Sequence, residues 1–390
     1  MKQIAKDRVT LSVISFSHMI NDMYMNFLQV ILPFLVISGI KIGKGTFLVS
    51  AFTLTSSIAQ PVFGYIADKK NYKWLIVVGT LWMSILLCFV GIENNYLLLL
   101  VTVSIAGLGT AAFHPQASSI VRTLSSAKKG FFQAIFIACG NVGWSLTPLI
   151  IVPLIQANSL KVTVFFFIPG LIASILLWLV ADKKKTEPKV IQQKIATPMN
   201  IRFSEWKELI KIMVVVICRS LVYFSLVAFL PLFLLQKNIP IITSSKLLFI
   251  MLFTGAVGGL IGGYISDKWS RKGVITISLI LAGMFLWFFV NSGGIMIWIY
   301  LAIAGAALLA SFSVTVVLAQ EIFKGKAAFA SGLMLGLGTG IGGLGVGIFG
   351  IMTEHVGINS VIKTLICIPI IAGLFSLTIK KQNTINPGGA

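Results

Sequence analysis

Long apolar stretches, separated by short polar segments, run along the whole of this 390-residue chain. A membrane helix needs ~20 consecutive apolar residues to cross the hydrocarbon core of a bilayer. Runs of about that length occur near residues 10–36, 45–67, 73–92, 96–120, 131–156, 161–181, 209–235, 245–266, 273–291, 294–319, 328–352 and 357–379. The pattern predicts an all-α integral membrane protein with twelve transmembrane helices and short loops.

A polar segment rich in lysine and glutamine divides these runs into two sets of six. We therefore predict an N-terminal six-helix bundle over 1–181, a cytoplasmic linker over 182–207 and a C-terminal six-helix bundle over 208–390. Two short matches support a repeat. Leu32–Leu35 recurs as Leu230–Phe233, and Gly64–Lys69 recurs as Gly263–Lys268. Parallel repeats of this kind, related by an axis along the membrane normal, are one arrangement found in secondary transporters.

Charge is scarce and unevenly placed. Charged residues make up 11% of the chain and hydrophobic residues 57%, whereas a soluble domain carries about 25% charged residues. The net charge of +20 comes mostly from loops on the side of the two termini. On the opposite side we find only Lys41, Lys44, Lys161, Lys237, Lys246 and Lys363. By the positive-inside rule both termini are cytoplasmic, so the basic residues set orientation and contact anionic lipid, and do not bind nucleic acid.

The repeated segment carries the resemblance to a known family. Gly64–Lys73 and Gly263–Lys272 resemble the loop signature of the major facilitator superfamily, in which Gly and Asp precede a basic cluster. Ser17–Tyr24, Ala112–Pro115 and Gly140–Gly143 resemble segments of the fosmidomycin-resistance group of drug-efflux proteins. The resemblance implies the major facilitator fold, a bacterial-type plasma (inner) membrane location and secondary transport by a monomer.

One acidic residue lies deep inside an apolar run. Asp22 is the only one of the 11 acidic residues in such a position, ~18 Å along the first predicted helix. His18 and Asn21 share its helix face by their spacing. An ionisable residue within the bilayer usually marks a functional site or a partner, because burying it is costly. We therefore expect Asp22 to bind a proton or the solute; the alternative is a structural, hydrogen-bonded carboxylate.

The second half contains one cation at a position equivalent to the neighbourhood of Asp22. Arg219 lies well inside an apolar run, and the repeat relates it to Asn21, beside Asp22. A buried guanidinium needs an anionic partner, which is either Asp22 or an anionic group of the solute. Tyr223 follows one turn later on the same face. A purely structural ion pair is the alternative.

Two further polar side chains complete the predicted substrate and proton site. His114 is expected at the same membrane depth as His18, and histidine titrates near neutral pH, so the two could share a proton path. Asn141 stands midway along the fifth predicted helix beside Gly140 and Gly143. For both His114 and Asn141 the alternative is a role in helix packing.

The repeated loops are predicted to control gating. Their charged residues, at the cytoplasmic ends of helices, can hold neighbouring helices together in one state and release them in another. These residues are Asp68, Lys69 and Lys73 in the first copy and Asp267, Arg271 and Lys272 in the second.

No nucleotide-binding loop, catalytic constellation or metal-ligand spacing is apparent, and the cysteines lie singly in apolar runs. We therefore expect no enzyme activity, cofactor or metal, and transport driven by a proton gradient. The favoured function is proton-coupled export (antiport) of a small anionic or zwitterionic solute or antibiotic through a central cavity. Two alternatives stay open: a proton symporter importing a sugar or organic acid, and an exporter of a metal-chelating metabolite.

Overall fold

The computed structural model describes residues 2–70, 74–124, 129–180, 203–322 and 327–380. Within these ranges the chain forms twelve α-helices and two short 3₁₀ segments, and no strand. The first six helices are α1 (Lys2–Ile37), α2 (Ile42–Lys70), α3 (Trp74–Cys88), α4 (Tyr96–Thr123), α5 (Lys129–Asn158) and α6 (Phe167–Val180), with 3₁₀ segments at Phe89–Gly91 and Leu160–Phe166.

The last six helices follow the same order of long, nearly continuous elements. They are α7 (Phe203–Gln236), α8 (Ile241–Lys268), α9 (Arg271–Val290), α10 (Met296–Ile322), α11 (Ala327–Val356) and α12 (Ile358–Ser376). Eleven helices of the described chain are long and apolar enough to cross a membrane. The twelfth, α11, is 30 residues long and has no charged side chain before Glu354. The predicted all-α membrane fold is confirmed.

Two helices extend further than their apolar runs predict. α1 begins at Lys2 and not near residue 10, and α7 begins at Phe203, inside the predicted linker 182–207. Neither extension contains glycine or proline, the residues that most strongly disfavour a helix. The helix can therefore continue beyond the part that spans the membrane. The remainder of the predicted linker, up to residue 202, lies outside the described residues.

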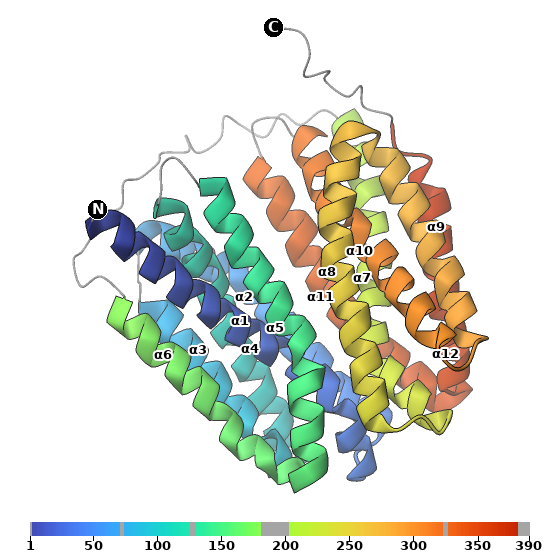
Figure 1. Cartoon of the computed structure of the whole chain (residues 1–390), viewed down its shortest axis with the longest axis horizontal. Coiled ribbons are helices and arrows are strands. Elements are labelled where there is room, and N and C mark those ends of the chain that lie inside the picture. The colour runs from blue at the N-terminus through green and yellow to red at the C-terminus, as the bar shows by residue number, and fades with distance from the viewer. Residues whose placement is uncertain (1, 71–73, 125–128, 181–202, 323–326, 381–390) are drawn as a thin grey trace, which may run out of the picture.

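The two sets of helices meet along a few long contacts. Figure 1 shows the start of α1 and the end of α12 at the same end of the molecule, with α1–α6 on one side and α7–α12 on the other. α2 packs along α11, α5 along α8, and α1 touches α7. These three pairs form the boundary between the halves.

Hydroxyl side chains line the part of α2 that packs on α11. We call Thr46, Ser50, Thr53 and Ser57 the hydroxyl stripe. The Ser50 hydroxyl donates to the Gly343 carbonyl oxygen at 2.7 Å, and the Ser57 and Thr339 hydroxyls lie 3.1 Å apart. Glycine spacing along α11 allows this close approach, because a side chain at Gly343 or Gly350 would collide with the stripe.

One further contact closes the same boundary at the end away from the termini. There the Gly43 amide, in the first turn of α2, donates to a carboxylate oxygen of Glu354 at 2.9 Å. The hydrogen bonds that join α2 to α11 thus extend from Gly43, near that end, to Ser57 at the middle of α2. The two halves are therefore joined on the side opposite the termini.

Candidate functional site

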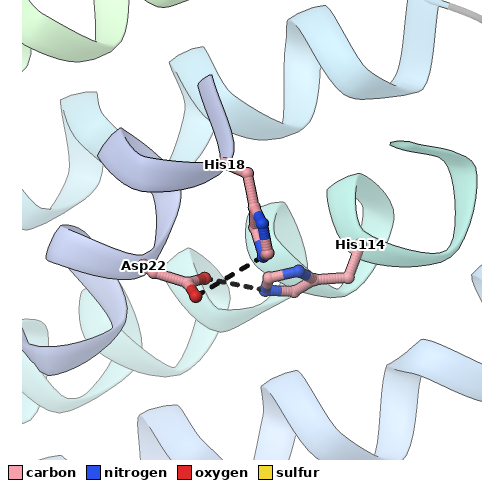
Figure 2. A group of neighbouring side chains, drawn as sticks. All are labelled: His18, Asp22 and His114. Carbon is pink, nitrogen blue, oxygen red and sulfur yellow. Dashed lines mark ion pairs between the residues drawn. The ribbon is translucent and has the colours of Figure 1, made fainter. Parts of the chain in front are cut away.

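The deepest charged group of the first half lies between two histidines. Asp22 and His18 come from α1, and His114 comes from α4 (Figure 2). One Asp22 carboxylate oxygen is 3.4 Å from His18 Nε2, and the other is 3.5 Å from His114 Nε2. His18 is buried, while the Asp22 and His114 side chains keep exposed fractions of 14% and 20%. The sequence predicted all three residues as members of the site, and the structure brings them together.

The backbone of α5 holds His18 in one orientation. The His18 ring stacks on Phe136 with centroids 3.9 Å apart and 11° between the planes. Its Nδ1 lies 2.7 Å from the Phe136 carbonyl oxygen. Gly140, one turn further along α5, contacts His18 and Asp22 so closely that a Cβ there would collide with both. α5 is therefore pressed against the cluster, and glycine at position 140 is what permits it.

This orientation fixes where the proton on the His18 ring lies. A carbonyl oxygen only accepts hydrogen bonds, so Nδ1–H of His18 is the donor to Phe136. In a neutral ring the other nitrogen, Nε2, then carries a lone pair, and this lone pair faces an Asp22 oxygen at 3.4 Å. Two acceptors in contact need a shared proton, held by the imidazole or by the carboxyl group.

The imidazole of His114 has a sulfur atom as its neighbour. His114 Nε2 lies 3.1 Å from the thioether sulfur of Met25, and the same nitrogen faces Asp22. The His18 and His114 rings meet edge to face at 5.1 Å. Met25 follows Asp22 by three residues on α1. Four potential ligand or proton-binding groups therefore surround one point between α1 and α4.

The two predicted asparagines behave differently. Asn21 is fully buried, and its Oδ1 accepts a hydrogen bond from the Thr110 hydroxyl at 2.7 Å. This bond joins α1 to α4 next to the cluster, so Asn21 packs the helices that carry it. Asn141, in contrast, is exposed on α5 and is not part of the cluster.

The buried cation of the second half has no carboxylate partner in the described chain. Arg219 on α7 is 3% exposed. Its Nη1 donates to the Thr315 hydroxyl of α10 at 3.2 Å, and its guanidinium lies 4.8 Å above the Phe312 ring. Among the described residues no acidic side chain comes within ion-pair distance of it. The pairing of Arg219 with Asp22, one of the two alternatives from the sequence, is not formed because each side chain packs within its own half.

Tyr223 lies at the boundary between the halves. Its ring stacks on Trp144 of α5 at 6.5 Å, and Trp144 meets Phe224 edge to face at 6.0 Å. The buried indole Nε1–H of Trp144 has no hydrogen-bond partner in the described chain. Sequence reasoning missed Trp144, Thr315 and Phe312. None of them is ionisable, so no charge signal marked them, and only helix packing brings them to the site.

The second repeated loop joins the ends of four helices, α8, α9, α10 and α12. Arg271 bonds Asp267 at 3.1 Å and Glu321 of α10 at 2.5 Å. Lys272 donates to the Leu377 carbonyl oxygen, just after α12, at 2.5 Å. In the first copy, Lys73 and the side chains of Asp68 and Lys69 lie outside the described residues. The gating role of both loops stays a prediction.

The cluster also provides a set of metal-ligand atoms. Those of His18, Asp22 and His114 all lie within 4.8 Å of one another. Spacing along the chain did not indicate a metal site, because the third member comes from a different helix.

Known proteins resemble this chain over most of its length. The family model of the Major Facilitator Superfamily matches residues 14–346. The fosmidomycin resistance protein of Escherichia coli K12 is 29% identical over 93% of this chain and 91% of its own length. The quinolone resistance protein NorA of Staphylococcus aureus Mu50 is 26% identical over 63% of this chain and 62% of its own. A bacterial homologue of the human lysosomal transporter Spinster, solved in an inward-facing, unoccupied conformation, superposes with a TM-score of 0.80 at 15% identity, covering 96% of this chain and 97% of that one.

Proposed function

Because this chain belongs to the major facilitator superfamily, and is thus a multi-pass membrane transporter and not an enzyme, we propose that it exports a small anionic or zwitterionic solute in exchange for protons. The two halves alternate between states open to either side of a bacterial-type plasma membrane. Both termini lie in the cytoplasm, in keeping with the distribution of lysine and arginine. The chain acts as a monomer.

The observation that carries proton coupling is the contact between His18 and Asp22. His18 donates from Nδ1 to the Phe136 carbonyl, so its Nε2 faces a carboxylate oxygen at 3.4 Å. The pair is stable with a shared proton and repulsive without one. Gain or loss of this proton changes the charge between α1, α4 and α5. Such a change can shift the equilibrium between two packed arrangements of the helices.

The class of solute follows from Arg219. Its guanidinium is buried against one hydroxyl and one aromatic ring. A guanidinium has five N–H donors arranged to bind carboxylate or phosphate groups in a bidentate manner, and Thr315 uses one of them. An anionic group on the solute would satisfy further donors and neutralise the charge.

The direction of transport rests on the relatives. Two proteins that match this chain over most or much of its length are named for resistance to fosmidomycin and to quinolones. A transporter confers resistance to a drug when it exports the drug, and this is the direction that we propose. Fosmidomycin is therefore the first probe for this chain, followed by a panel of amino-carboxylates.

The test uses everted membrane vesicles that are acidified inside by respiration, with a fluorescent dye reporting the pH difference. Each compound of the panel is added in turn, and a transported solute dissipates the pH difference as protons leave in exchange. We expect Asp22→Asn to abolish this response while the protein remains in the membrane in normal amount. The matched control is Glu93→Gln, a carboxylate in the loop before α4, which should respond like wild type. Undiminished exchange by Asp22→Asn would overturn the assignment of the proton to this pair.

A further inference from the structure

The contact that holds a proton between His18 and Asp22 also has the geometry of a metal site. We propose that His18, Asp22 and His114 bind one divalent late transition-metal ion, with Zn²⁺ as the representative ion. The ligand atoms, their separations and the groups that orient them all favour such an ion.

The nitrogen–oxygen separations in the cluster are close to those of a tetrahedral site. Zn²⁺ binds imidazole nitrogen and carboxylate oxygen at ~2.0–2.2 Å, which places neighbouring ligand atoms roughly 3.3–3.5 Å apart. The two nitrogen–oxygen separations in the cluster are 3.4 Å and 3.5 Å. Each imidazole faces a different oxygen of Asp22, and one ligand atom from each of the three residues lies within 4.8 Å of the others. A rotation of these side chains would bring the three ligand atoms around one ion.

The surroundings orient the ligands for a metal. A metal-binding histidine usually donates its second ring N–H to a carbonyl or carboxylate, which turns the other nitrogen toward the ion. His18 does this through the Phe136 carbonyl at 2.7 Å, and stacking on the Phe136 ring fixes its plane. His18 Nε2 is therefore directed at Asp22 with its lone pair available.

A fourth potential ligand lies beside the cluster. The Met25 sulfur lies 3.1 Å from His114 Nε2, close enough to contact an ion held by that nitrogen. Imidazole suits zinc, copper and nickel, whereas thioether sulfur selects the softer ions. His114 and Asp22 keep exposed fractions of 20% and 14%, so the side chains of the cluster are not completely enclosed.

The experiment measures metal binding directly, without a solute or a gradient, so its outcome is independent of the function proposed above. Protein purified in detergent with a histidine-free tag is stripped with EDTA. It is then titrated with Co²⁺ at pH 7.5 and followed by visible absorption, and Zn²⁺ is added to displace the Co²⁺. We expect one ion per chain, an absorption typical of tetrahedral or five-coordinate Co²⁺, and displacement by one equivalent of Zn²⁺.

The chain offers a matched control, because it has only 3 histidines. His18→Ala, His114→Ala and Asp22→Asn should each weaken binding by at least ~10–100-fold. His355→Ala, which changes an exposed residue at the end of α11, should bind like wild type. Thermal unfolding without metal identifies any variant that fails to fold, and the other two cluster variants then decide. Absence of binding by wild type below ~1 mM, or equal affinity in the three cluster variants and His355→Ala, would overturn the proposal.

Discussion

Arg219 is the residue on which the proposed class of solute rests. Its charge is enclosed by α7 and α10, and the groups around it are a hydroxyl and an aromatic ring. An aromatic face attracts a cation but leaves its N–H donors without acceptors. The residue is therefore suited to an anion that arrives and departs during transport.

Replacing Arg219 should weaken solute binding in graded steps. Arg219→Gln removes the charge and its charge-assisted hydrogen bonds, which contribute ~1.5–3 kcal/mol each. We expect the solute concentration at half-maximal transport to rise about 10–100-fold. Arg219→Lys keeps the charge but loses the planar arrangement of N–H donors. Its half-maximal solute concentration should therefore lie between those of Arg219→Gln and wild type.

Initial rates of solute uptake into everted vesicles measure this effect. Lys211→Gln is the matched control, because it removes another cation of α7, one that is already paired with Glu208 at 2.7 Å. Its concentration dependence should stay that of wild type. An Arg219→Gln variant with wild-type concentration dependence would show that the anion binds elsewhere.

Individual residues also show where sequence reasoning stops. Asp22 could be singled out because the sequence alone shows a carboxylate inside an apolar run. Equal depth suggested only that His114 and His18 share a proton path. The contact of His114 with Asp22 could not be predicted in this way, since it depends on α1 lying beside α4. The environment of Arg219 could not be predicted at all. Thr315 and Phe312 are ordinary members of an apolar helix until packing brings them to the guanidinium.

At the scale of the helices, the contact between α2 and α11 is built from complementary small groups. The hydroxyl stripe of α2 fits against glycines of α11, with Ser50 bonded to the Gly343 carbonyl. Transmembrane helices associate closely where small residues let the backbones approach. A contact made of small groups can also separate without exposing a large apolar surface.

A larger side chain at the closest approach should favour separation of the two helices. In Gly350→Val the new side chain would collide with Thr46, and overpacking of this kind costs ~1–3 kcal/mol. We expect Ser50→Cys, in a background without native cysteines, to react faster with a small maleimide in the presence of Gly350→Val. The rate of labelling should increase several-fold.

The control for this experiment lies on the same helix. A Cβ added at Gly336 would meet open space in the described part of the chain, so Gly336→Val makes the same change in helix propensity without the collision. Its labelling rate should match that of the parent. Equal rates for Gly350→Val and Gly336→Val would contradict the role given to this contact.

The helices themselves were largely predictable, because each membrane-spanning helix corresponds to a continuous apolar run of sufficient length in the sequence. All twelve runs correspond to helices in the same order. The ends were less predictable, as α1 and α7 show, because a helix continues through polar residues until its backbone is interrupted. Which helices pair across the halves was not encoded in any single run.

At the scale of the whole molecule, the two halves are joined on the side away from the termini. Transport by alternating access requires this junction to open while the other side closes. A covalent link across the junction should therefore stop the cycle. Ser57 and Thr339 suit such a link, because their hydroxyl oxygens lie 3.1 Å apart.

We expect Ser57→Cys with Thr339→Cys, in a background without native cysteines, to form a disulfide under mild oxidation. Transport should fall to the background rate when oxidised and return on reduction. Each single cysteine variant should be insensitive to the oxidant. Full transport by the cross-linked protein, with the link verified by mass spectrometry, would contradict opening at this junction.

The histidine–aspartate cluster belongs entirely to α1, α4 and α5, and the surroundings of Arg219 belong entirely to α7 and α10. This division has an evolutionary consequence. If the first half couples transport to protons and the second half binds the solute, mutations around Arg219 can change the solute without disturbing proton coupling. A gene of this design could acquire a new cargo by drift in its second half alone, while the first half stays under constant selection.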